Sequence, residues 1–148
     1  MNVFRFQLQK VLDVKEKEKE QAEWAFGKSV QRKNEEELKL FRLTERHEAV
    51  TNMLHEAQSQ TCSAAQLIEL SQYRQAVEQS IVNQRRTLYG CEQEVERCQR
   101  RLAERVQETQ LWQRLREKAL GQFLYAERLK EQKELDEIGT QLYLRRSN

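Results

Sequence analysis

The sequence predicts an all-α protein folded as a long two-helix antiparallel coiled-coil hairpin. Proline, the strongest helix breaker, is absent from the 148 residues, and only four residues are glycine. Charged residues make up 34% of the chain and hydrophobic residues 38%. This balance predicts a narrow apolar stripe on charged helices rather than a thick globular core.

The clearest heptad pattern lies in the middle of the chain. Residues at alternating spacings of three and four are Leu67, Leu70, Arg74, Val77, Ile81, Gln84, Leu88, Cys91, Val95, Cys98 and Leu102. Nine of these eleven are apolar, which is typical of a coiled-coil seam. Beyond residue 102 we expect the register to slip, because the apolar residues there lose strict heptad spacing. They are Val106, Leu111, Trp112, Leu115, Ala119, Phe123 and Ala126.

The first half of the chain carries a weaker seam. Its members are Leu8, Leu12, Ala22, Phe26, Leu40, Leu43, His47, Val50, Leu54 and Ala57. Four charged residues interrupt it, namely Lys15, Lys19, Lys33 and Glu36. Each interruption costs stability, because a fully buried leucine contributes about 1.5–3 kcal/mol.

A polar segment around Ser63 separates the two seams, and Ser63 followed by Gln66 fits a helix capping box. We predict one coiled-coil domain over residues 1–148. Its first helix covers about 4–58, its loop about 59–63 and its second helix about 64–142.

A fold at residue 62 pairs each position i with position 124 minus i. This register places Leu12 near Trp112 and Phe4 near Leu120, and it leaves helix two unpaired beyond about residue 122. The unpaired part carries Phe123, Leu124, Leu129, Leu135, Ile138, Leu142 and Leu144. Such a helix either binds another protein or frays in solution.

The charge distribution argues against binding to nucleic acid or to an anionic membrane. Residues 1–62 carry 11 basic and 11 acidic side chains, and residues 63–148 carry 15 and 13. The densest basic stretch is diluted by glutamates, which leaves nucleic-acid binding a minor alternative. It contains Arg85, Arg86, Arg97, Arg100, Arg101 and Arg105. The longest stretch without charge, Ala57–Ile68, is too short and too polar to cross a bilayer, so we expect a cytoplasmic protein without membrane insertion.

The sequence offers no pattern for catalysis, metal binding or a cofactor. Cys91 and Cys98 are seven apart on the seam and read as buried thiols, whereas Cys62 in the loop is expected to be the more reactive. His47 and His55 are eight apart, which does not form a compact metal site. A two-helix rod has no desolvated cleft in which a catalytic group could be tuned, so we predict that the protein is not an enzyme.

A further stripe runs beside the seam near the loop. It contains Tyr73, Val77, Ser80 and Gln84, at spacings of four, three and four. These residues either form a binding surface or simply widen the seam.

Both ends of the chain resemble members of the FliJ family. The segment Phe4–Asp13, followed by Lys15, Glu18 and Ala22, resembles the start of these proteins. Glu117–Ala119 and the segment Glu127–Ile138, which contains KEQKELDEI, resemble their end. Chain length, the two-helix plan and the loop position also match, so the resemblance covers the whole chain.

The resemblance implies a component of the flagellar type III export apparatus that supports flagellum assembly, motility and chemotaxis. Family members bind the hexameric export ATPase as a central stalk that resembles the coiled coil of the gamma subunit of rotary F-type ATPases. They also contact the membrane export gate protein and export chaperones. A cytoplasmic location with peripheral association at the inner face of the cytoplasmic membrane follows from these partners.

Two candidate sites follow from the residues and the resemblance together. An ATPase-binding site at the open end would contain Phe4, Phe6, Lys133, Glu134, Leu135, Glu137 and Ile138. An export-gate site near the loop would contain Tyr73, Val77, Ser80 and Gln84. The alternatives are a stalk or scaffold of another, virulence-type secretion system, or a nucleic-acid-binding coiled coil.

Overall fold

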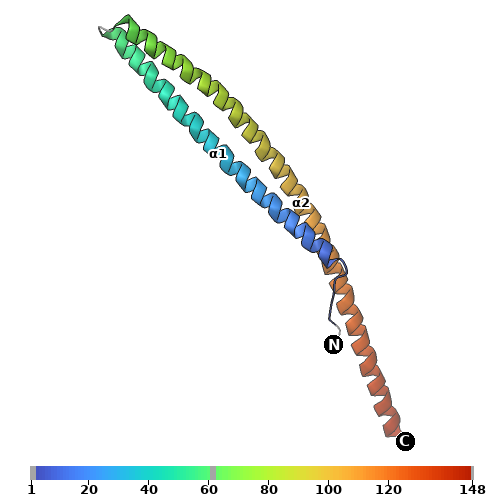
Figure 1. Cartoon of the computed structure of the whole chain (residues 1–148). Helices are drawn as coiled ribbons and strands as arrows, with labels where there is room; N and C mark the ends of the chain where they lie inside the picture. Colours follow the sequence, from blue (N-terminus) through green and yellow to red (C-terminus); the bar gives the residue numbers. More distant parts are fainter. Residues whose placement is uncertain (1–2, 61–62, 148) are drawn as a thin grey trace. The chain divides into compact units, whose positions relative to one another are not determined.

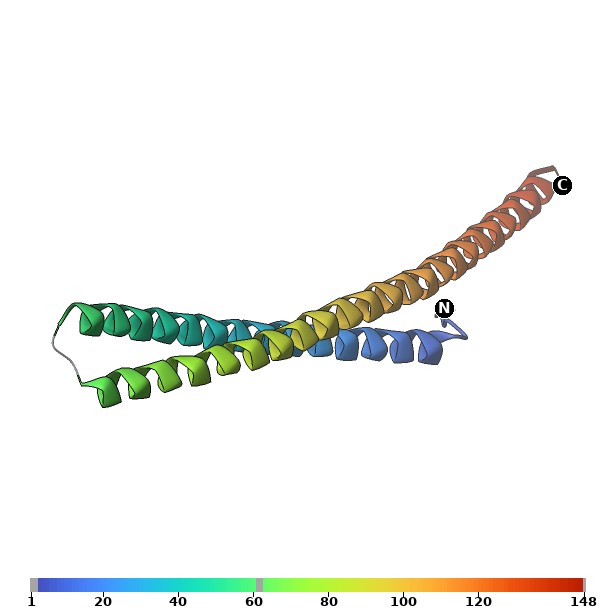
Figure 2. The ribbon, with the colours of Figure 1, turned by 90° about the horizontal axis from the view of Figure 1, so that it is seen from above.

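The computed structural model describes residues 3–60 and 63–147, and two long helices account for almost all of them. Helix α1 covers Gln9–Ser59 with 51 residues, and helix α2 covers Ala64–Ser147 with 84 residues. The two helices pack against each other as an antiparallel hairpin (Figures 1 and 2). The predicted fold class is therefore confirmed.

The helix boundaries differ from the expected ones at two places. Helix α1 begins at Gln9 rather than near Phe4, and Phe4 packs instead as part of a non-helical segment. Helix α2 continues to Ser147, well past residue 142. Arg145 and Arg146 in its last turn complement the helix dipole, and no proline stops it. The start of α2 agrees with the predicted cap, since the Gln66 amide donates to Ser63 Oγ at 3.3 Å.

Contacts divide the chain into two compact units, and each contains part of both helices. The loop-end unit is Gln21–Ala103, and the open-end unit combines Met1–Glu20 with Glu104–Asn148. In the loop-end unit the predicted seam of α2 is the set of residues that α1 covers. All residues from 63 to 92 that lie outside this seam are exposed. The seam residues Val77 and Cys91, by contrast, are only 4% and 3% exposed.

Helix α1 keeps a strict alternation of three and four along its covered face. The covered positions from residue 12 onward include Ala22, Phe26, Leu40, Leu43, His47, Val50, Leu54 and Ala57. Lys15, Lys19, Lys33 and Glu36 occupy seam positions in the same series, and Ser29 is buried there. Leu8 is 44% exposed, so the seam begins at Leu12 and not at Leu8.

The expected register slip after residue 102 is wrong. The covered positions continue at the same spacing as Arg105, Thr109, Trp112, Arg116, Ala119 and Phe123. Leu111 and Leu115 are 56% and 40% exposed, and Ala126 is also exposed. Polar side chains hold seam positions here because each finds a partner across the hairpin, so the apolar residues alone did not mark the covered face.

Candidate functional site

Four charged side chains form a closed ring across the two helices in the open-end unit. Lys15 Nζ lies 3.3 Å from Glu108 Oε2, and Arg105 Nη1 lies 2.9 Å from Glu18 Oε2. Contacts within each helix close the ring, with 3.6 Å from Lys15 to Glu18 and 3.2 Å from Arg105 to Glu108. The hydrogen bond that Lys15 donates to Glu108 holds the pKa of this carboxyl group below its ordinary value, and the hydrogen bond from Arg105 is the second cause.

A buried hydroxyl lies next to this ring. Thr109 is 1% exposed, and its Oγ1 lies 2.8 Å from the carbonyl oxygen of Arg105 and 3.2 Å from that of Lys15. Because the hydroxyl can donate to either carbonyl, a polar side chain is tolerated at a covered seam position. The sequence could have shown these partners, since Lys15 and Glu108 fit the expected hairpin register.

Polar pairs also cross the seam in the loop-end unit. Gln84 Nε2 donates to the Glu36 carboxylate and, at 3.1 Å, to the Glu36 carbonyl oxygen. The pKa of Glu36 is lowered, mainly by Gln84 and then by Lys39. His47 Nε2 lies 3.0 Å from Glu78 Oε1, and this contact is the main reason why the pKa of Glu78 is lowered.

The residues of the predicted export-gate site lie in two different environments. Val77 is 4% exposed and faces α1, and Gln84 is held by Glu36. Tyr73 is 46% exposed, and Ser80 is exposed with its hydroxyl donating to the Ala76 carbonyl at 3.1 Å. Only Tyr73 and Ser80 of the four therefore offer surface to a partner.

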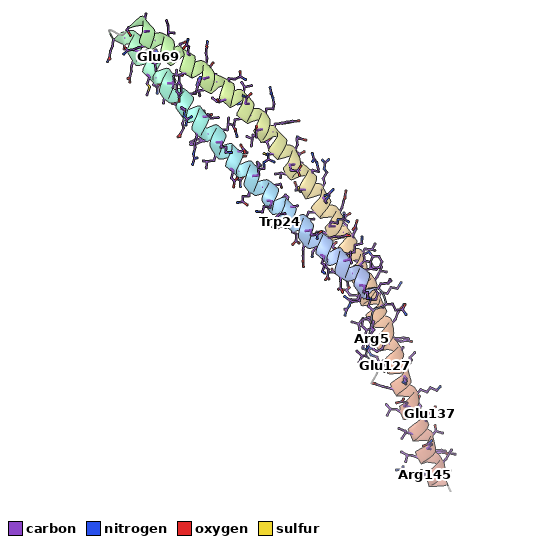
Figure 3. The ribbon with its side chains drawn as sticks, in the orientation of Figure 1. Arg5, Trp24, Glu69, Glu127, Glu137 and Arg145 are labelled. Carbon is purple, nitrogen blue, oxygen red and sulfur yellow. The ribbon has the colours of Figure 1, made fainter. Side chains whose placement is uncertain are left out.

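The far part of α2 is exposed around the whole helix. Glu127 is half-buried, and every residue from 128 to 147 is exposed. Leu135 and Ile138 are 63% and 54% exposed. Figure 3 labels Glu137 and Arg145, whose side chains project from this stretch with no other segment beside them. The hairpin register predicts an unpaired helix beyond about residue 122, and exposure is uninterrupted from residue 128 onward. Helix α2 is continuous through this stretch, the overhang.

The predicted ATPase-site residues of the overhang point in different directions. Leu135 and Ile138 are three residues apart and share a face of α2. Lys133 and Glu137 each lie two residues from Leu135, which places them on roughly the opposite face. The charges of Lys133 and Glu137 therefore do not border the apolar pair in space, whereas Glu134 lies four residues before Ile138 and does border it.

Phe4 and Phe6 lie where the non-helical N-terminal segment meets α2. The ring centroids of Phe4 and Phe123 are 5.5 Å apart, and the Arg116 guanidinium lies 5.5 Å from the Phe4 ring. Arg116 Nε also donates to Gln9 Oε1 at 3.1 Å. Phe6 is half-buried and helps to line a cavity of about 300 Å³ beside Phe123. Phe4 thus reaches Phe123 rather than Leu120, because an extended segment advances about 3.3 Å per residue and a helix 1.5 Å.

The structure does not bring the two parts of the predicted ATPase site together. Leu135 lies 12 residues after Phe123, a separation of about 18 Å along a helix. The open-end unit therefore presents an aromatic cluster of Phe4, Phe6, Arg116 and Phe123, followed by an exposed helix that carries Leu135 and Ile138.

Other chemistry finds little support within the described ranges. Among residues 3–60 and 63–147, no three acidic, histidine or cysteine side chains group as a metal site would require, and neither helix is long and apolar enough to span a membrane. Cys91 is buried and Cys98 half-buried, while Cys62 lies outside the described residues. In the basic stretch, Arg97 is paired with Glu94 at 2.8 Å and Arg105 belongs to the charged ring.

Comparison with known proteins agrees with this architecture. The sequence model of the family described as flagellar FliJ protein matches residues 4–148. A solved structure from Chlamydia trachomatis, described as a YscO homolog, superposes with a TM-score of 0.68 and is 21% identical in sequence. That match covers 95% of this chain and 96% of the other, and it shows a shared fold. No curated protein matches the chain.

Proposed function

Because this chain belongs to the flagellar FliJ protein family, we propose that it is the stalk that binds the hexameric export ATPase. Membership of the family makes it a non-enzymatic component of flagellar type III protein export. The proposal adds a location for the ATPase contact, namely the open-end unit. The observation that carries it is the run of exposed residues from 128 to 147 on an intact helix.

A helix with exposed leucine and isoleucine side chains gains free energy when a partner covers them. Leu135 and Ile138 are more than half exposed. Burying both side chains in the ATPase ring would contribute about 1.5–3 kcal/mol each before the costs of ordering and association. The contact requires no chemistry from the chain, only a rigid helix of suitable length, which suits a stalk.

The aromatic cluster is a second part of the proposed contact. Phe4 and Phe6 border the cavity beside Phe123 without filling it, so an apolar partner side chain could enter there. Lys133, Glu134 and Glu137 are exposed on the overhang, where they can complement charges on the walls of the ring.

The loop-end unit would contact the export gate. In this proposal the contact is made by Tyr73 and Ser80, while Val77 and Gln84 hold the hairpin together beneath them. Export chaperones are further proposed partners. These contacts would keep a cytoplasmic protein at the inner face of the cytoplasmic membrane and couple the ATPase to the gate.

The direct test is the rate of ATP hydrolysis by the purified flagellar export ATPase with increasing amounts of this chain. We expect the chain to raise the rate to a plateau. A pull-down that offers the chain both the flagellar ATPase and the ATPase of a virulence-type system distinguishes the proposal from its main alternative. If the chain is the stalk of a virulence-type system, it should prefer the ATPase of that system. An unchanged rate and no capture by the flagellar ATPase would overturn the proposal.

A further inference from the structure

A groove lined with cations runs beside the seam of the loop-end unit. Its cavity of about 260 Å³ is lined by Lys39, Arg42, Leu43, Arg46 and Gln84. The three cations are exposed and are spaced by three and then four residues, so they form one line on α1. Each of them comes one position before a covered seam residue of α1. We call this feature the cationic groove. Its floor is formed by Leu43 and Gln84, which are both half-buried.

The positive charge of the cationic groove is largely unpaired. Lys39 Nζ lies 3.2 Å from Glu36 Oε1, and a side chain of α2 also donates to this carboxylate. Across the described part of the chain, neither Arg42 nor Arg46 has an ion-pair or hydrogen-bond partner. Helix α2 adds no counter-charge here, because residues 79–91 include no acidic side chain. Two guanidinium groups therefore keep their full capacity to donate hydrogen bonds.

The chemistry and spacing of the two arginines suit carboxylates. A guanidinium group donates two parallel hydrogen bonds to a carboxylate, which makes this pair stronger and more selective than a contact between point charges. Arg42 and Arg46 are four residues apart, or about 6 Å along a helix. Two residues of an extended chain span about the same distance. A short acidic segment can therefore set one carboxylate against each arginine, with an aliphatic stem over Leu43.

The cationic line is short and has acidic residues at both ends. It covers residues 39–46, or about 10 Å of helix. Residues 35–37 are all glutamate, and Glu48 follows the line. Duplex nucleic acid carries one phosphate charge per about 1.7 Å along its whole length, so it would continue onto these carboxylates. The length of the line matches two or three carboxylates instead.

We propose that the cationic groove docks a short acidic segment of a partner protein. The segment places its carboxylates against Arg42 and Arg46. This site is separate from the ATPase contact of the proposed function, because it belongs to the loop-end unit. It is also separate from Tyr73 and Ser80 of the predicted export-gate site, since neither of them lines the groove.

Binding of a fluorescent hexaglutamate peptide to the full-length chain tests the proposal. Fluorescence anisotropy should show saturable binding of this peptide, and a hexaglutamine peptide should not bind. Arg42→Glu combined with Arg46→Glu should weaken binding roughly tenfold or more, because like charges then face each other.

The matched control is Arg85→Glu combined with Arg86→Glu. It changes the net charge by the same amount within the same unit, but neither residue lines the groove. We expect this control to weaken binding by less than about twofold in about 0.1 M salt, which screens charges more than about 10 Å apart. Circular dichroism checks that each variant keeps its helicity. If the reversal at the groove disturbs folding, Arg42→Gln with Arg46→Gln removes the two charges more mildly and should weaken binding several-fold.

The proposal is overturned if hexaglutamate does not bind the unchanged chain. Equal weakening by the two double reversals would also overturn it, because net charge alone would then drive binding. A thymidine oligonucleotide of equal charge that binds more tightly than hexaglutamate, and loses affinity in the groove variant, would assign the groove to nucleic acid. None of these measurements uses the export ATPase, so failure here leaves the proposed stalk function standing.

Discussion

The side-chain oxygen of Thr109 lies 3.2 Å from the carbonyl oxygen of Lys15 on the other helix of the hairpin. The two residue numbers sum to 124, which is the register expected for a fold at residue 62. Contacts on either side obey the same relation within one, since Lys15 meets Glu108 and Gln9 meets Arg116. Leu12 is 2% exposed and lies between these contacts, so it belongs opposite Trp112.

This register predicts an intramolecular disulfide. Cysteines introduced at positions 12 and 112, in a chain whose own three cysteines are replaced by serine, should crosslink within one chain on mild oxidation. Non-reducing gels at low protein concentration would detect a monomer of altered mobility. A pair at positions 12 and 102, displaced by about 15 Å along the helix, is the control that should not close. Products that form only between chains would contradict the hairpin.

The charged ring predicts a dependence of stability on acid. The pKa of Glu108 is lowered in the folded state, so its stabilising contribution is complete above the ordinary value of 4.5. The contribution is lost as the pH falls below that value and through the folded pKa. Between pH 5 and pH 3, the melting temperature of the Glu108→Gln variant should therefore fall by less than that of the unchanged chain.

The control for this prediction is Glu104→Gln, which removes the same charge outside the ring. Its melting temperature should fall on acidification as steeply as that of the unchanged chain. A Glu108→Gln profile parallel to both would mean that the ring contributes nothing to folding in solution.

Thiol reactivity should follow burial along the seam. Cys91 is 3% exposed and Cys98 is half-buried, so an alkylating reagent should modify Cys98 faster than Cys91 in the folded chain. Mass spectrometry of timed samples measures both rates, and denaturant should make them equal. Cys62 is still expected to react first, from its place in the predicted loop. Faster modification of Cys91 than of Cys98 would show that the seam of α2 is misplaced.

Substitutions in the predicted export-gate site should separate residues that bind a partner from residues that stabilise the hairpin. Val77→Ala removes buried methyl groups and should lower the free energy of unfolding by roughly 1–2 kcal/mol. Tyr73→Ala removes an exposed side chain and should change it by less than about 0.5 kcal/mol. If Tyr73 contacts the gate, its substitution should still reduce secretion of flagellar subunits. A large loss of stability in Tyr73→Ala would favour a packing role, and normal secretion would place the gate contact elsewhere.

Heptad spacing predicted the loop-end unit well, because its seam of α2 is nearly all apolar from Leu67 to Leu102. Spacing failed beyond Leu102, where Arg105, Thr109 and Arg116 occupy covered positions that an apolar pattern cannot reveal. Their partners are on the other helix, so they appear only once the two helices are aligned. Lys15 looked like an interruption for the same reason.

The candidate site shows a similar division. The exposed face of Leu135 and Ile138 was predictable, because the hairpin register leaves them beyond the end of helix one. The position of Phe4 was not, since the extended path of residues 3–8 depends on contacts with Arg116 and Phe123.

Stimulation of the export ATPase by a double variant of the overhang is the most direct test of the stalk proposal. Leu135→Asp with Ile138→Asp should leave ATP hydrolysis at the rate of the ATPase alone, because the exposed apolar pair is lost. Helicity and melting temperature should barely change, since both residues lie outside the packed part of the hairpin. Ala126→Asp with Thr140→Asp adds the same charge on the opposite face and should stimulate hydrolysis like the unchanged chain. Full stimulation by the first double variant would contradict an ATPase contact at the overhang.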